Sequence, residues 1–232
     1  MMAQARAKNS NSFAIWISVI VVVILVAIGA LVVWMNNAQS GPGTQPQSSA
    51  INTETGAIAV GTGSKTLDTY VDFMCPICGQ FETQFGPTID SMVADGSITL
   101  NIHPISILDR ASQGTQYSTR SANAAYAVAV KHPDLALKYL QALFAQQPQE
   151  NTSGLTNDQL VSIAEQVGAT DVADDITKGT YNQYVGYITK KTPIQPGAAG
   201  PSTPTILIGG TLASNSQLFA LSPEAFKATV LK

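Results

Sequence analysis

An uninterrupted apolar run near the N-terminus constrains this chain more than any other feature. Residues 13–35 read FAIWISVIVVVILVAIGALVVWM, which is 23 residues without a charge. A bilayer core about 30 Å thick needs about 20 apolar helical residues, so the run predicts a transmembrane helix that anchors the chain in the lipid bilayer. Trp16 and Trp34 lie near its two ends, where indole rings favour the headgroup boundary.

The distribution of charge predicts which side of the membrane holds the rest of the chain. Arg6 and Lys8 precede the apolar run, and all 15 acidic residues follow it. The positive-inside rule then makes residues 1–12 a cytoplasmic tail and places the remainder outside the cytoplasm, on a single-pass cell-membrane protein. A cleaved signal peptide is the alternative, with Ala38-Gln39-Ser40 as a cleavage site, although its apolar core is usually only about 7–15 residues long. Either way the globular part is exported to a compartment where disulfides persist.

Composition excludes several function classes. The formal charge is −3, which argues against a nucleic-acid partner, because such a protein needs a basic stripe to neutralise phosphates. The two cysteines exclude a four-cysteine zinc site and a scaffold of several disulfides. The two histidines leave little room for a histidine-built metal centre. We therefore expect neither a metal ion nor a cofactor.

The exported part divides into a linker and one domain. Residues 36–56 are rich in Ser, Gln, Gly, Pro and Asn, which predicts a flexible linker. Residues 57–232 are numerous enough to form a substantial core. Strand patterns fall at 57–61, 65–73, 98–102 and 205–208, and helical patterns at 78–93, 112–131, 133–146, 156–167, 171–191 and from 222 onward.

The order of these elements predicts an α/β fold, a sheet layered with helices. A nearly strand-free block interrupts it, so we expect an all-helical insertion over about 108–192. In the second strand, period-two alternation puts Leu67, Thr69, Val71 and Phe73 on one face.

A pair of cysteines follows that strand. Cys75-Pro76-Ile77-Cys78 lies where the strand passes into a helix. The unpaired N–H groups of a first helical turn and the helix dipole favour negative charge at Cys75, which lowers a thiol pKa into the range of about 3.5–7.5. Pro76 suits the first helical position, because its missing N–H costs nothing there. The pattern predicts thiol–disulfide exchange, with Cys75 attacking, Cys78 resolving, and a redox disulfide Cys75–Cys78.

Other uses of two cysteines fit less well. A structural disulfide of this spacing restricts the unfolded chain little. A c-type haem needs a histidine directly after the pair, and residue 79 is Gly79. A metal site completed by His103 and His132 requires distant residues to converge. A cysteine hydrolase with His103 as its base leaves the second thiol without a use.

Three features together resemble the DsbA-like branch of the thioredoxin superfamily: FMCPICGQFE at 73–82, the helical insertion, and GPSTPTILIGG at 200–210. The resemblance covers about 57–232, and the N-terminal anchor is similar to that of membrane-anchored Gram-positive, particularly actinobacterial, members. It implies a thioredoxin-like fold in which Thr203-Pro204 is a cis-proline dipeptide facing the Cys75 sulfur. An X–Pro bond is the common route to a cis peptide. The Thr203 backbone would pair with an extended substrate segment.

Two residues depart from this family pattern. Ile77 stands where strong oxidants often carry a histidine that stabilises the thiolate, so the resemblance implies a less depressed Cys75 pKa and a less oxidising disulfide. Thr69 stands where superfamily members often bury an acid. Asp72 matches an acid common in this branch, although solvation of the strand end explains it equally well.

The resulting prediction is a protein disulfide oxidoreductase that introduces disulfides into exported proteins with free thiols by mixed-disulfide exchange. The resemblance implies that a quinone-linked membrane oxidase reoxidises the pair. A reductase or isomerase of the cell envelope is the first alternative. A non-redox thioredoxin-like module that binds clients or metal is the second.

Overall fold

The computed structural model describes residues 12–232, so the tail expected over residues 1–12 lies almost entirely outside the described residues. The chain forms two compact units, which divide between Gly41 and Pro42. The first contains α1 (Ser12–Ser40), whose segment Ile15–Met35 is long and apolar enough to cross a bilayer, with a mean hydropathy of 3.2. The helix therefore fits a single-pass membrane anchor.

The second unit is built on a mixed sheet. Within residues 12–232 the sheet has six strands in the order β1-β2-β4-β3-β5-β6. The central strand β3 runs parallel to β4 and antiparallel to β5, and the other pairings are antiparallel. The strands are β1 (Ile51–Asn52), β2 (Ala57–Val60), β3 (Lys65–Val71), β4 (Ile98–Pro104), β5 (Thr205–Ile208) and β6 (Thr211–Leu212).

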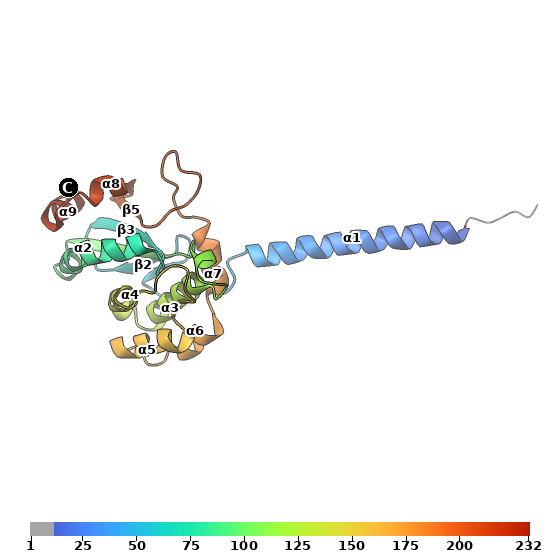
Figure 1. The fold of residues 1–232 in the computed structure, drawn as a ribbon, viewed down its shortest axis with the longest axis horizontal. Coiled ribbons are helices and arrows are strands. Elements are labelled where there is room, and N and C mark those ends of the chain that lie inside the picture. Colours follow the sequence, from blue (N-terminus) through green and yellow to red (C-terminus); the bar gives the residue numbers. More distant parts are fainter. Residues whose placement is uncertain (1–11) are drawn as a thin grey trace, which may run out of the picture. The chain divides into compact units, whose positions relative to one another are not determined.

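The helices follow the predicted order, and with the sheet they confirm the α/β thioredoxin-like fold. Figure 1 shows α3 to α6 grouped on one side of α2 and β3, with α8 and α9 on the other. The pattern expected over 171–191 is split, because Gly179 has a φ of +64° and ends a short helix. The described elements are α2 (Pro76–Ala94), η1 (Asp109–Ala111), α3 (Tyr117–Lys131), η2 (Pro133–Leu135), α4 (Ala136–Ala145), α5 (Asn157–Val167), α6 (Ala173–Lys178), α7 (Asn182–Thr189), α8 (Asn215–Leu218) and α9 (Pro223–Val230).

An aromatic cluster packs α2 against the C-terminal helix. The ring of Phe85 stacks on that of Phe226 from α9 with centroids 4.3 Å apart, and Phe81 meets Phe226 edge-on at 5.9 Å. All three side chains are buried. Aromatic pairs in such geometries contribute about 0.5–1.5 kcal/mol beyond their buried area, so the cluster fixes the helix that follows the cysteine pair.

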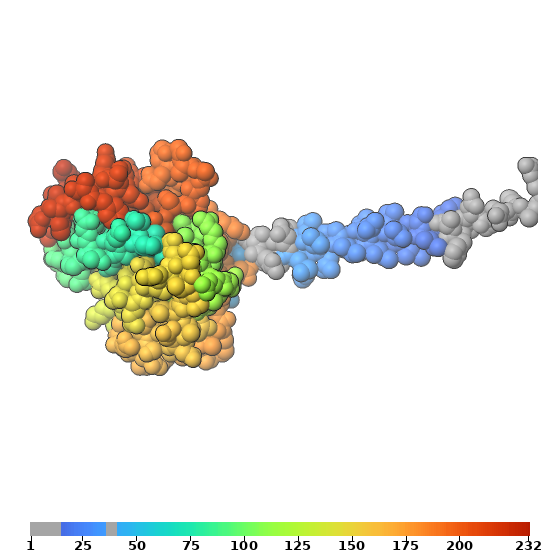
Figure 2. Space-filling model, in the orientation of Figure 1, coloured from blue at the N-terminus to red at the C-terminus, as the bar shows by residue number. Residues whose placement is uncertain are grey.

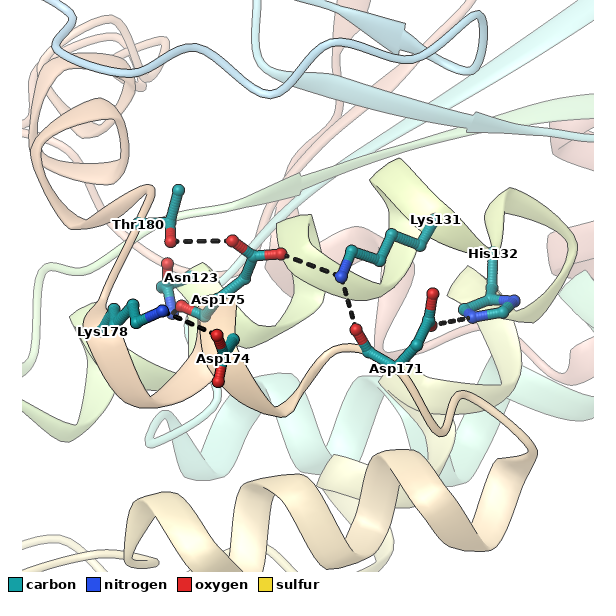
Figure 3. Close-up of polar contacts among 8 residues, drawn as sticks. All are labelled: Asn123, Lys131, His132, Asp171, Asp174, Asp175, Lys178 and Thr180. Atoms are coloured by element: carbon teal, nitrogen blue, oxygen red, sulfur yellow. Dashed lines mark hydrogen bonds and ion pairs between the residues drawn. The ribbon is translucent and has the colours of Figure 1, made fainter.

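Polar contacts join two helices of the insertion (Figure 3). At the end of α3, Lys131 donates to the backbone carbonyl of Asp171 and lies 3.3 Å from the carboxylate of Asp175, while His132 Nε2 lies 2.6 Å from the Asp171 carboxylate. Asn123 donates to the backbone carbonyl of Asp175 from the middle of α3. These contacts hold the start of α6 to α3. The residues that make them are distant from Cys75 and Cys78 in the sequence.

Within the second unit, residues 42–56, part of the segment for which composition predicts a flexible linker, contact the sheet and the helices. Helix α1 continues through Ser40, and Ile51 pairs with Ile58 at the edge of the sheet. Composition does not reveal these contacts, because the Ile51 side chain is buried in the core while other contacts are made through backbone carbonyls. Four consecutive carbonyls are each engaged by a distant side chain: Thr53 by Tyr184 OH (2.8 Å), Glu54 by Lys191 Nζ (2.9 Å), Thr55 by His103 Nδ1 (3.2 Å) and Gly56 by Tyr126 OH (2.7 Å).

Candidate active site

Cys75 is placed by the junction between β3 and α2. The strand ends at Val71, and a tight turn follows in which the Cys75 N–H donates to the Asp72 carbonyl at 2.9 Å. Cys75 is the N-cap of α2, with extended backbone angles (φ −76°, ψ 115°), and Pro76 occupies the first helical position. The Cys75 sulfur therefore lies after the carboxyl end of the central strand and at the N-terminus of α2, where the helix dipole is positive.

The surroundings of the Cys75 sulfur stabilise its thiolate. They lower the pKa of Cys75 from 9.0 to about 6. The largest cause is a hydrogen bond from the thiol of Cys78, which outweighs burial; the Thr203 side chain and the N–H groups of Cys78 and Ile77 add to it. The sulfur also lies 3.3 Å from the Thr203 carbonyl oxygen, to which the protonated thiol donates.

Cys78 has the opposite electrostatic character. Its side chain is buried, and burial together with the neighbouring Cys75 raises the pKa of the Cys78 thiol well above 9.0. Both thiols are free in this structure. Near neutral pH one sulfur is therefore mostly a thiolate, with Cys75 only 5% exposed, and the other is a more deeply buried, protonated thiol that donates to it.

The loop before β5 closes the other side of the site. The Thr203–Pro204 peptide bond is cis, and Pro204 is buried. Asn215 Nδ2 donates to the Pro204 carbonyl at 2.7 Å, and Thr205 pairs with Tyr70 in the sheet. The loop that carries Thr203 is thereby fixed to β3, the strand that precedes Cys75.

Asp72 holds the turn from within. Its side chain is fully buried, and it accepts hydrogen bonds from the N–H groups of Met74, Ile107 and Leu108, each at 2.9 Å. Burial raises the pKa of Asp72 to about 6, and the N–H donors limit that rise. Solvation of the strand end is thus not the role of this acid. Its carboxylate ties the cysteine turn to the segment after β4.

The two residues between the cysteines face outward. Pro76 and Ile77 are exposed, and 42% of Ile77 is accessible to solvent. Ile77 contributes its backbone N–H to the Cys75 sulfur. Its side chain supplies an apolar surface beside the nucleophile.

A second acid, half-buried and not singled out by the sequence patterns, lies next to the site. Glu82, one turn after Cys78 on α2, lines a small cavity with Cys78 and Thr69. Burial raises the pKa of Glu82 to about 7, against a hydrogen bond from Gln141. Its position four residues after Cys78 was a usable signal, because residues at that spacing share a helix face. Gln147, from the loop after α4, also contacts the cysteine turn without any signal near it in the sequence.

A mixed sheet, a dithiol at a helix N-terminus and a cis-proline loop define the class of thioredoxin-like thiol-disulfide oxidoreductases. A family model described as thioredoxin matches residues 56–230. The chain belongs to this thioredoxin family.

Solved structures resemble the chain over most of its length. The reduced form of the disulfide bond oxidoreductase DsbG from Mycobacterium tuberculosis has a TM-score of 0.62 and 29% identity, covering 84% of this chain and 89% of that one. Oxidised DsbA from the same organism has a TM-score of 0.62 and 27% identity, covering 75% and 97%. MdbA of Corynebacterium diphtheriae, a thiol-disulfide oxidoreductase, shares the fold with a TM-score of 0.62 and 22% identity, covering 79% and 95%.

A curated relative matches a shorter stretch. The serine/threonine-protein kinase PknE of Mycobacterium tuberculosis is 38% identical over 112 residues, which is 47% of this chain. The match spans only 20% of the length of that kinase.

Proposed function

We propose that this protein is a membrane-anchored oxidoreductase that donates the Cys75–Cys78 disulfide to exported proteins as they fold. The observation that carries the proposal is the contrast between the two thiols, because a stabilised Cys75 thiolate is a good leaving group and favours the reduced form of the pair. A protein whose reduced form is stabilised gives its disulfide away.

The reaction has two exchange steps. A client thiolate attacks the Cys75 sulfur and breaks the Cys75–Cys78 bond, and the Cys78 sulfur leaves and takes up a proton. A second client thiolate then attacks the client sulfur of the mixed disulfide, and Cys75 leaves as a thiolate. The client loses two electrons and gains a disulfide, while the cysteine pair gains those two electrons.

The loop around Thr203 suits the binding of client backbone. Its carbonyl lies 3.3 Å from the nucleophilic sulfur, beside the place where a client sulfur must approach. An extended client segment that pairs with the Thr203 backbone would be aligned by strand addition. The exposed side chain of Ile77 offers that segment an apolar contact.

The reduced pair must pass its electrons on. A quinone-linked membrane oxidase is the class of partner that we propose, because the anchor keeps the domain beside the membrane. The cysteine-bearing domain lies outside the cytoplasm in this proposal, since Arg6 and Lys8 precede the span and no acid does. Protease added to intact cells should therefore degrade the domain; complete protection until lysis would reverse the orientation.

The equilibrium reduction potential of the full chain against glutathione tests the direction of transfer. A value from about −120 to −170 mV, at the oxidising end of the thioredoxin-fold range, supports disulfide donation. A value from about −230 to −270 mV would overturn it in favour of a reductase. Absence of a reversible couple would leave a module that binds without redox turnover.

A further inference from the structure

The turn that carries Cys75 is held by a glutamine from the helical insertion. Gln147 Nε2 donates to the carbonyl oxygens of Phe73 (3.1 Å) and Cys75 (2.9 Å). Its own N–H donates to the Phe144 carbonyl at 3.2 Å, so the residue extends the end of α4. The Phe144 ring packs on Phe73 with centroids 5.2 Å apart, which brings this end of α4 to the turn. One amide thus bridges the end of the strand and the N-cap of α2.

Gln147 complements Asp72 at this turn. Asp72 accepts from the N–H of Met74, while Gln147 donates to the carbonyls of the residues on either side, Phe73 and Cys75. The backbone before the nucleophile is therefore engaged through both its donors and its acceptors. A turn fixed in this way keeps the Cys75 sulfur in one position relative to the first turn of α2.

The glycine after the second cysteine provides an independent observation. A Cβ atom added to Gly79 would lie 2.3 Å from Gln147 Oε1, closer than any real contact. Glycine is less favourable than alanine in a helix, and the missing Cβ at this position leaves room for the Gln147 amide, which a larger residue would push aside. Gly79 also donates its N–H to the Cys75 carbonyl at 3.2 Å, the same oxygen that Gln147 engages.

We propose that Gln147 is a positioning residue for thiol–disulfide exchange, which holds the Cys75 carbonyl so that the first-turn N–H groups of α2 point at the Cys75 sulfur. The inference deepens the proposed function, on which it rests. The physical reason is electrostatic. Carbonyl oxygens carry partial negative charge beside a developing thiolate, and an amide that donates to two of them offsets that charge and prevents the peptide units from turning toward the sulfur.

The side chain is accessible from solvent through a groove of about 520 Å³ lined by Pro76, Gly79, Gln80, Phe144 and Gln147 among others. In Figure 2 the surface of α2, in teal, lies between the insertion in yellow and the C-terminal elements in red. The exposed Gln80 lines the same groove and provides a matched control of the same residue type.

The experiment compares Gln147→Met with Gln80→Met in the reduced full-length protein. Methionine keeps the length of the side chain and removes both donors. Alkylation of Cys75 by iodoacetamide is followed against pH, since only the thiolate reacts and Cys78 stays protonated. We expect Gln147→Met to slow alkylation at pH 6 about fivefold, which corresponds to a rise of the Cys75 pKa from about 6 to about 7, and Gln80→Met to leave it unchanged.

A double-mutant cycle separates this role from general stability. Gly79→Ala alone should reproduce the slower alkylation, because its Cβ displaces the amide. In a Gln147→Ala background the same substitution should have no further effect. An unchanged pH profile for Gln147→Met, with only a lower melting temperature, would overturn the inference. The proposed function fails differently, when the wild-type protein does not oxidise a reduced client, and that result leaves the alkylation profile as it is.

Discussion

Titration of Cys75 couples the reduction potential of the pair to pH in a way that can be worked out in advance. The perturbation is a change of pH through the Cys75 pKa of about 6, while the Cys78 pKa stays well above 9.0. Below about pH 6, reduction of the disulfide takes up two protons with its two electrons. Above about pH 6 it takes up only one, because Cys75 stays a thiolate.

The magnitude follows from the shift in pKa. At pH 7 about 90% of reduced Cys75 is thiolate, whereas a thiol with the usual pKa of 9.0 would be about 1% thiolate. The extra ionisation stabilises the reduced form by about 1.4 kcal/mol, which raises the potential by about 30 mV. The potential should fall by about 60 mV per pH unit below the break and by about 30 mV per pH unit above it.

The assay is equilibration with glutathione buffers from about pH 5 to 8, with the redox state read by alkylation and mass shift. Glu82 also titrates in this range, with a pKa of about 7, so Glu82→Gln is the control, and the break should stay where it is in this variant. A constant slope of about 60 mV per pH unit up to pH 8 would refute the argument, since Cys75 would then be protonated throughout.

Three further substitutions test individual polar groups of the domain. Glu82→Gln should raise the free energy of unfolding by up to about 3 kcal/mol at pH 8 and by much less at pH 4, because an acid with a raised pKa makes stability fall as pH rises from about 4.5 to 7. Urea unfolding at pH 4 and at pH 8 checks this. An equal gain at both pH values would contradict it. Asp72→Asn should lower the free energy of unfolding by about 2 kcal/mol, because an amide cannot accept from three converging N–H donors. A change below about 0.5 kcal/mol in the same urea assay would be evidence against that role of Asp72. Tyr126→Phe removes the hydroxyl that donates to the Gly56 carbonyl at 2.7 Å, so amide hydrogen exchange should become faster around β1 and β2. Exchange that increases equally across all strands would instead indicate global destabilisation.

Local sequence patterns predicted the parts of the fold that depend on neighbouring residues. The two-residue alternation along 65–73 identified the central strand, and the proline after Cys75 marked the start of α2. The separation of thiol character between Cys75 and Cys78 also follows from local position. Cys75 occupies the N-cap of α2, and Cys78 lies in the first turn of the helix and is more deeply buried.

The features that local patterns did not predict depend on contacts between residues that are far apart in the sequence. Gln147 lies 72 residues after Cys75, and nothing near it in the sequence indicates that its amide meets that turn. The segment after α1 has a composition typical of disorder, yet Tyr126 and Tyr184 reach its carbonyls from 70 and 131 residues away. Hydrogen bonds to backbone carbonyls carry no signature in the residue that accepts them.

Trapping of mixed disulfides tests the central claim most directly. In cells that produce the full chain with Cys78→Ala, Cys75 can still exchange with clients but cannot be released by its own partner thiol. The account predicts that reducible adducts with exported proteins accumulate on this variant, and that none form when Cys75→Ser is added. No adducts on Cys78→Ala, or equal adducts without Cys75, would contradict exchange through this pair.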